Sequence, residues 1–195
     1  MSFKTLDDLD LNDKRVLVRV DINVPMQDGQ ITDDTRMRAV LPTIREILEK
    51  GGRPILLAHF GRPKGKPNMD LSLKPLAAPM AALLGSTVTY SERPRDPEAG
   101  ETVLVENTRF TPMEEANDPG MAKFLASTAD IYVNDAFSAS HRAHASTEGV
   151  ARLLPSARLA HYLRVKSAAG DPENWERKMI PRTIAPTKRT FLEVY

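Results

Sequence analysis

The chain has 195 residues, of which 41% are hydrophobic, enough for one domain with a buried core. Its formal net charge is only +1, so no overall field draws it to nucleic acid or to a membrane, and we expect neither as a partner. It contains no cysteine, which excludes disulfides, thiolate catalysis and cysteine-based zinc sites. Its aspartate-rich amino terminus lacks the apolar segment of a targeting signal, and no run approaches the ~20 apolar residues of a membrane span. We therefore expect a cytoplasmic protein.

The first predicted strand and helix carry the clearest signals. The run over 15–21 is short and rich in β-branched residues, which favours a strand. Apolar residues at helical spacing predict a helix over 35–50, which one of the two aspartates before it caps and Gly51 ends. Pro42 lies inside this helix and predicts a kink or a local break.

The later elements continue the alternation of strand and helix. Strands are predicted over 54–59, 87–90, 102–106 and 131–134. Helices are predicted over 72–84, from Asn117 onward and over 146–154. This alternation is typical of the α/β class, and we expect a doubly wound, mostly parallel, Rossmann-like sheet in a single domain.

The composition changes after Pro155. Residues 156–195 hold eight Lys or Arg against four Asp or Glu and show no sustained apolar period. We therefore divide the chain into a domain over 1–155 and an irregular, basic carboxy-terminal tail over 156–195. A solvated extension and a basic arm for nucleic acid are both compatible with the tail, and the scarcity of aromatic residues among its basic ones favours the extension.

Four polar motifs follow predicted strands: RVDINVP (19–25), AHFGRP (58–63), ENTRF (106–110) and NDAFSASHRAH (134–144). The carboxyl ends of parallel strands meet at one edge of a sheet, where ligands bind in open α/β folds. Guanidinium groups match carboxylate and phosphate oxygens two at a time, so this edge predicts a site for a small, strongly anionic ligand. The candidate binding residues are Asp21, Asn23, Arg36, His59, Arg62, Arg109, His141 and Arg142.

Structural interpretations of the same residues stay open. Asp21 and Asn23 can cap a turn at the end of the first strand. Arg36 lies in the first turn of its helix, where free N–H groups favour an anion, but it can equally be a solvated side chain. Glu106 can simply pair with Arg109.

A metal site is a further possibility at His141 and His144, which lie three residues apart. No carboxylate or third histidine accompanies them at ligand spacing. We therefore expect anion binding at His141 and Arg142, and no metal ligands.

Residues 1 to about 155 resemble the amino-terminal domain of the phosphoglycerate kinase family. The resemblance rests on five segments in order: RVDINVP, ITDDTRMRAVLPTI, HFGRPKG, ENTRF and NDAFSASHRAHAS. It implies the reversible phosphoryl transfer of glycolysis, in which 1,3-bisphosphoglycerate and ADP give 3-phosphoglycerate and MgATP. It covers about four-fifths of this chain but only about half of a family member.

The resemblance also implies roles for the motif residues. Asp21 and Asn23 would contact the glycerate end of 3-phosphoglycerate. Arg36 would bind near its carboxyl group and stabilise the phosphoryl group in flight, as the catalytic residue. The substrate's own phosphate would be held by His59, Arg62, Arg109 and Arg142, with His141 beside them.

The family's second domain, which carries the nucleotide site and a magnesium-binding acid, has no counterpart in this sequence, and no GxxxxGK pattern exists. Mg²⁺ with ATP or ADP therefore belongs to full-length members, which are usually monomeric, and we expect no cofactor site in this chain. A truncation with a replaced end, as a shifted reading frame produces, would explain the tail. We expect little or no turnover by this chain alone; a noncatalytic anion-binding module and a nonfunctional fragment are the alternatives.

Overall fold

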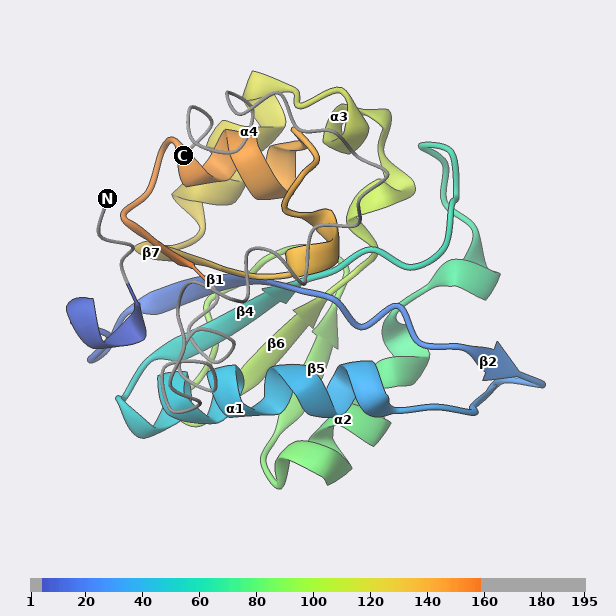
Figure 1. Ribbon diagram of the computed structural model, residues 1–195, viewed down its shortest axis with the longest axis horizontal. Helices are drawn as coiled ribbons and strands as arrows, with labels where there is room; N and C mark the ends of the chain where they lie inside the picture. Colours follow the sequence, from blue (N-terminus) through green and yellow to red (C-terminus); the bar gives the residue numbers. More distant parts are fainter. Residues whose placement is uncertain (1–4, 159–195) are drawn as a thin grey trace, which may run out of the picture.

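The computed structural model describes residues 5–158, and its central feature is a parallel sheet with helices on both faces (Figure 1). The strands lie in the order β5-β6-β4-β1-β7-β8, and each pairs in parallel with its neighbours. Their bounds are β1 Arg15–Val20, β4 Arg53–Leu57, β5 Val88–Ser91, β6 Thr102–Val105, β7 Ile131–Asp135 and β8 Ser156–Arg158. The predicted α/β class and parallel sheet are confirmed.

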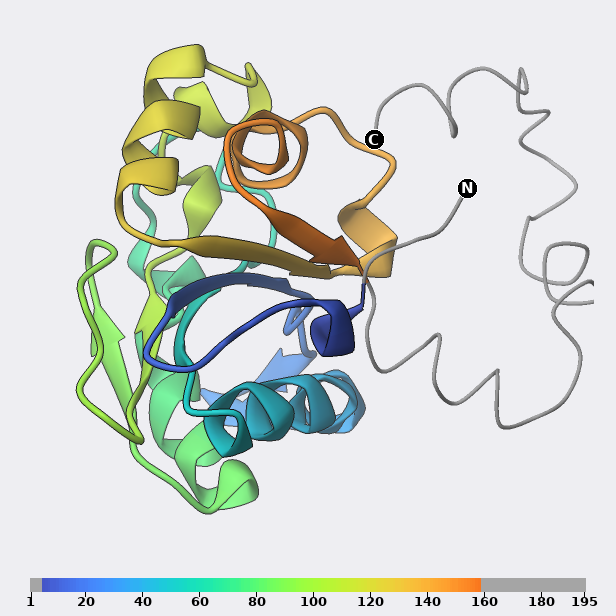
Figure 2. The same cartoon turned by 90° about the vertical axis from the view of Figure 1, so that its left-hand side faces the viewer.

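Two helices cover each face of the sheet, as the perpendicular view also shows (Figure 2). Helices α1 (Thr35–Glu49) and α2 (Ala77–Leu84) lie on one face, and α3 (Pro112–Glu115) and α4 (Pro119–Ser127) lie on the other. Single-turn elements connect them: η1 Leu6–Asp8, η2 Met69–Leu71, η3 Lys74–Leu76, η4 Thr108–Phe110, η5 Phe137–Ala139 and the π turn η6 Ala145–Gly149.

The core is split by the sheet into two layers, because successive strand side chains point to opposite faces. On β1, Val16, Val18 and Val20 pack in the layer that contains the apolar face of α1. Leu17 packs in the other layer, with Leu125 of α4. Arg19 shares the parity of Leu17, so the alternation directs a charged side chain into that second layer.

Helix α1 confirms the predicted helix, decides between the two predicted capping aspartates and corrects one detail. Asp33, rather than Asp34, caps its first turn, since Asp33 Oδ1 accepts a hydrogen bond of 2.8 Å from the backbone N–H of Thr35. Pro42 does not break the helix, which runs continuously over 15 residues. The chain leaves the helix through Gly51, whose φ of 75° is the left-handed conformation that glycine adopts without strain.

Three predicted helices begin or end elsewhere than expected. The helix predicted over 72–84 starts only at α2, after two 3₁₀ turns, and Pro79 fits in its first turn, where backbone N–H groups have no helical partner. Asn117 is not the cap of α4, since Asp118 accepts the backbone N–H of Met121 at 2.9 Å. The last predicted helix forms mainly as the π turn η6.

The sequence did not predict α3, β8 or the short hairpin of β2 (Met26–Gln27) and β3 (Gln30–Ile31). The hairpin extends away from the sheet, beyond the amino-terminal end of α1 (Figure 1). Strand β8 pairs with β7 and comprises the first three residues of the predicted tail. The rest of that tail lies outside the described residues, and the domain boundary at 155 stays a prediction.

The four motifs share one edge of the sheet, as predicted. Strands β6, β4, β1 and β7 are consecutive in the sheet and parallel, so their carboxyl ends lie together, on the right in Figure 1. Helix α1 begins at the same edge, which brings its first turn beside the end of β1. The ligand-binding edge of an open α/β sheet is therefore the place where the motif residues meet.

Candidate functional site

The end of β1 and the first turn of α1 are joined through Asp21. Its Oδ2 accepts hydrogen bonds from Arg36 Nη1 at 2.8 Å and from the Ser138 hydroxyl, and its Oδ1 accepts from the backbone N–H of Asn23 at 3.2 Å. Burial raises the pKa of Asp21, but the hydrogen bonds from Ser138, Asn23 and Arg36 outweigh it and hold that pKa below its ordinary value. Asp21 is therefore an ionised acceptor that orients Arg36.

The side chain of Asn23 is tied to the loop after β4. Its Oδ1 accepts a hydrogen bond of 3.0 Å from the backbone N–H of Gly61, and the Gly61 carbonyl accepts one of 3.2 Å from Arg109 Nη1. Gly61 has a φ of 59°, and a Cβ added there would lie 2.7 Å from Leu71 Cδ2. Gly61 thus connects the motifs after β1, β4 and β6 through its own N–H and C=O groups.

His59 is neutral rather than cationic. Its Nδ1 lies 2.8 Å from Arg19 Nη2. Burial, with the positive fields of Arg19 and Arg109, lowers the pKa of His59 to about 3. The imidazole can therefore donate a hydrogen bond to an anion, but it adds no charge at neutral pH.

Arg109 is a buried cation of the site. Its side chain is only 5% exposed, and its Nε lies 3.3 Å from Glu115 Oε1. The pairing with Glu106 that the sequence left open does not form in the described structure. Glu106 instead accepts hydrogen bonds from the hydroxyls of Ser72 and Tyr90 and from two backbone N–H groups.

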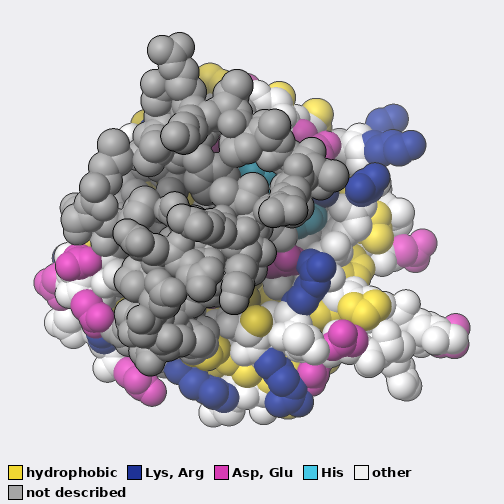
Figure 3. Space-filling model, viewed as in Figure 1, with side chains coloured by type: hydrophobic (Ala, Val, Ile, Leu, Met, Phe, Trp, Pro, Cys, Tyr) yellow, Lys and Arg dark blue, Asp and Glu magenta, His cyan; other side chains and the backbone are white. Residues whose placement is uncertain are grey.

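Two further candidates, Arg62 and Arg142, lie after β4 and β7. Arg142 is half-buried, and Arg62 is exposed. Both lower the pKa of Arg109, after the larger effect of its burial, so each lies within electrostatic range of Arg109. We call His59, Arg62, Arg109 and Arg142 the basic cluster. Figure 3 shows Lys, Arg and His side chains on this part of the surface.

His141 is the predicted residue that the structure does not join to the others. It is exposed, and within residues 5–158 no hydrogen bond or ion pair connects it to the cluster.

The same described residues contain no group of three His, Cys, Asp or Glu side chains that could hold a metal ion. Nor does any helix among them have the length and apolar character to cross a membrane.

The sequence interpretation missed Arg19 and Ser138, which contact His59 and Asp21 respectively. A signal for Arg19 was present, because an arginine at a core-facing position of an otherwise apolar strand requires buried polar partners. Ser138 had no comparable signal, since an exposed serine in a loop fits any turn.

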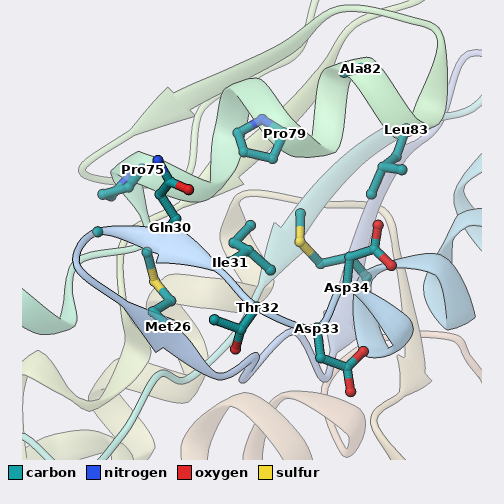
Figure 4. Close-up of a pocket in the computed structure, with 12 residues that line it drawn as sticks. Met26, Gln30, Ile31, Thr32, Asp33, Asp34, Pro75, Pro79, Ala82 and Leu83 are labelled. Atoms are coloured by element: carbon teal, nitrogen blue, oxygen red, sulfur yellow. The ribbon is translucent and has the colours of Figure 1, made fainter.

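A separate hollow of about 730 Å³ lies between the β2–β3 hairpin and α2 (Figure 4). Its walls are mixed: Met26, Ile31, Pro79 and Leu83 are among the apolar lining residues, and Gln30 and Thr32 are among the polar ones. Its charged groups are two aspartates, and none of the candidate residues lines it. The hollow therefore does not match the anionic ligand that the motifs predict.

Comparison with known proteins matches this chain to phosphoglycerate kinases. A family model described as phosphoglycerate kinase matches residues 6–163. The phosphoglycerate kinase of Roseobacter denitrificans is 58% identical over 161 residues, covering 80% of this chain and 41% of that protein. The phosphoglycerate kinase of Novosphingobium aromaticivorans is 54% identical over 204 aligned residues, covering 99% of this chain and 52% of that protein.

Solved structures agree with the sequence relatives. The phosphoglycerate kinase of Coxiella burnetii superposes with a TM-score of 0.77 at 38% identity, covering 86% of this chain and 44% of that one. That of Pyrococcus horikoshii gives a TM-score of 0.73 at 31% identity, with 85% and 44% covered. The chain thus spans about half the length of the relatives it matches.

Proposed function

Because this chain belongs to the phosphoglycerate kinase family, we propose that the carboxyl edge of its sheet binds the phosphorylated three-carbon acid of the family's reaction, 3-phosphoglycerate or 1,3-bisphosphoglycerate. One observation carries the proposal: the ends of four consecutive strands bring an Asp21–Arg36 pair and the basic cluster to the same edge. The whole protein would act in glycolysis in the cytoplasm.

The arrangement supports different roles for the Asp21–Arg36 pair and for the basic cluster in binding the ligand. Arg36, with a side chain 51% exposed, is available to a carboxylate and, as the catalytic residue, to the phosphoryl group in transfer. Asp21 holds Arg36 and can accept a hydrogen bond from the ligand hydroxyl, and Asn23 lies beside it. The basic cluster would supply donors for the substrate's own phosphate, and His141, which is exposed and next to Arg142 in the sequence, could add one more.

The chemistry needs little more from these side chains. In-line phosphoryl transfer depends on positioning and on neutralising charge at the equatorial oxygens. A carboxylate acceptor is already deprotonated at neutral pH, so no general base is required. This agrees with a site built from arginines in which the one histidine of the cluster is neutral.

We expect no site for MgATP or MgADP in this chain, because the sequence has no GxxxxGK motif and the chain spans about half the length of the relatives it matches. We therefore expect this chain alone to bind the acid with little or no turnover. A noncatalytic anion-binding module is the second candidate, and a nonfunctional fragment would bind nothing.

Titration of the 195-residue chain with 3-phosphoglycerate, followed by NMR, tests the proposal. We expect saturable binding that weakens with salt, and a loss of roughly tenfold or more in affinity for Arg36→Ala, since hydrogen bonds to charged groups are worth about 1.5–3 kcal/mol. Arg38→Ala is the matched control, because Arg38 lies on the same helix turn but pairs with Asp34. Equal losses in both variants, or no saturable binding, would contradict the proposal.

A coupled assay for ADP formation from ATP and 3-phosphoglycerate tests whether this chain alone is a complete kinase. We expect turnover near background for this chain, with binding intact. Robust turnover would show that the chain is a complete kinase and would refute the assignment of a binding half.

A further inference from the structure

A line of buried polar groups lies beside the basic cluster and takes no part in the function proposed above. Arg19 on β1 is 1% exposed, Glu114 on α3 is 0% exposed, and Ser146 in the π turn lies between them. Arg19 Nε donates to Ser146 Oγ at 3.0 Å, and the Ser146 hydroxyl donates to Glu114 Oε1 at 2.5 Å. At its other end Arg19 Nη2 meets His59 Nδ1 at 2.8 Å.

With Glu114 ionised as the counter-charge of Arg19, the hydrogens of this line have one assignment. A guanidinium group has donors and no acceptor, so Ser146 Oγ must accept a hydrogen bond from Arg19. The single hydrogen of the Ser146 hydroxyl is then donated to Glu114. By the same rule His59 Nδ1 must accept from Arg19 Nη2. A neutral imidazole carries one hydrogen, which is therefore on Nε2.

Glu114 supplies the charge that makes the buried Arg19 tolerable. Burial raises the pKa of Glu114, while the hydrogen bonds of Ser146 and the fields of Arg19 and Arg109 oppose that rise. The backbone N–H of Ser146 also donates to Glu114 Oε2 at 2.9 Å. A buried cation without such a counter-charge would be strongly destabilising.

His59 is thereby fixed at its Nδ1 side and open at its Nε2 side. Within the described residues no hydrogen bond involves Nε2, and the ring lies in the fields of Arg109, Asp21 and Arg142. The Nε2–H group is thus a donor among the groups that the proposed function assigns to the anion.

We propose that Arg19, Ser146 and Glu114 are positioning residues that lock His59 in its Nε2–H tautomer, so that His59 offers an anion a neutral hydrogen-bond donor in a fixed orientation. The tautomer follows from the contacts alone. Its consequence for affinity rests on the proposed function, and the two are measured separately.

Two-bond ¹H–¹⁵N spectra of the histidine rings in the 195-residue chain report the tautomer directly. We expect wild-type His59 to show a protonated Nε2 and an unprotonated Nδ1 at pH 7. A mixture of tautomers, or protonation on Nδ1, would overturn the proposal whatever the chain binds.

Ser146→Ala removes the bridging hydroxyl at nearly constant volume. Arg19 then loses its Nε acceptor and is drawn toward Glu114, so we expect the Nδ1–H tautomer of His59 to appear. In the same variant 3-phosphoglycerate binding should weaken roughly threefold to tenfold, the range expected when a neutral hydrogen bond is lost. A His59 spectrum identical to wild type would overturn the proposal.

Ser72→Ala is the matched control, because Ser72 is also buried and also donates to a carboxylate, that of Glu106, but touches neither Arg19 nor His59. We expect it to leave the His59 spectrum unchanged. Arg19→Lys is a second test if Ser146→Ala does not fold, since a single ammonium cannot span Ser146 and His59 as the planar guanidinium does. If the tautomer responds as expected but the wild-type chain binds no 3-phosphoglycerate, the proposed function is refuted, whereas the positioning of His59 by Arg19, Ser146 and Glu114 is supported.

Discussion

Asp135, at the end of β7, provides a stability test that does not depend on any ligand. Its Oδ2 is buried and has no hydrogen-bond partner within the described residues, although the residue as a whole is only half-buried. Burial raises the pKa of Asp135 to about 7, and Thr43 of α1 is the neighbour that opposes this rise. The folded protein therefore keeps a proton that the unfolded chain releases at the ordinary carboxyl pKa.

The direction in which stability changes with pH follows from this difference in pKa between the folded and unfolded states. Between pH 4 and pH 7 the folded state binds one proton more than the unfolded state at Asp135, so the free energy of unfolding falls as pH rises. The slope is about 1.4 kcal/mol per pH unit, and it levels off above pH 7, where both states are ionised. From pH 5 to pH 8 this carboxyl costs the protein about 2.5 kcal/mol.

Asp135→Asn removes the titration and keeps the shape of the side chain. Urea unfolding followed by circular dichroism at pH 5, 6, 7 and 8 should therefore show the variant gaining about 2.5 kcal/mol relative to wild type across the series. Other groups titrate equally in both proteins, so the difference isolates Asp135. A constant difference between the two proteins would refute the reasoning.

Asp130→Asn is the control for that series. The hydrogen bond from Arg15, with its positive charge, lowers the pKa of Asp130 to about 2 against the opposing effect of burial. Asp130 is then ionised in both states from pH 5 to pH 8, and its stabilisation is lost only as pH falls below about 4 toward 2. We expect Asp130→Asn to destabilise by an amount that does not change between pH 5 and pH 8.

Three more outcomes follow from the structure. Gly61→Ala should destabilise by about 1–3 kcal/mol in a thermal melt, because its Cβ would meet Leu71 at a positive φ; an unchanged melting temperature would contradict this. Ile44→Ala should cost about 2–5 kcal/mol in urea unfolding, because Ile44 is fully buried, whereas Arg45→Ala beside it should cost less than about 1 kcal/mol. The ring resonances of His59 should not titrate between pH 5 and pH 8, since its pKa is about 3; a transition near pH 6.5 would show a solvated imidazole.

Five strands of the sheet could be predicted from local patterns, because each lies in a short apolar run, and their alternation with helices favours parallel pairing. The start of α2 could not, since prolines at 75 and 79 are compatible with either a 3₁₀ turn or the first turn of a helix, and packing of Leu76 and Met80 decides between them. Strand β8 also lacks a local signal, because three residues become a strand only by pairing with β7.

The candidate site could also be predicted only in part. Its location at the carboxyl edge of the sheet follows from the parallel strands, so Asp21, Arg36 and Arg109 were predicted as members. Their partners were not, because contacts such as Arg19 with Ser146 join residues 127 positions apart, and no local pattern encodes such a distance. The neutral state of His59 could not be predicted from the sequence either, because burial and the positive charges of two arginines determine it.

The two ends of the site differ in how firmly they are held, and this difference bears on the proposed substrate. Arg109 is buried and bonded to Gly61, and His59 is bonded to Arg19, so both side chains are held in place without a ligand. Arg36 is half exposed in its pair with Asp21, and exposed ion pairs are worth about 0–1 kcal/mol. Under the proposed function a ligand carboxylate would therefore draw Arg36 from Asp21 at little cost, so that His59 and Arg109 would anchor the acid and Arg36 would adjust to its reacting end.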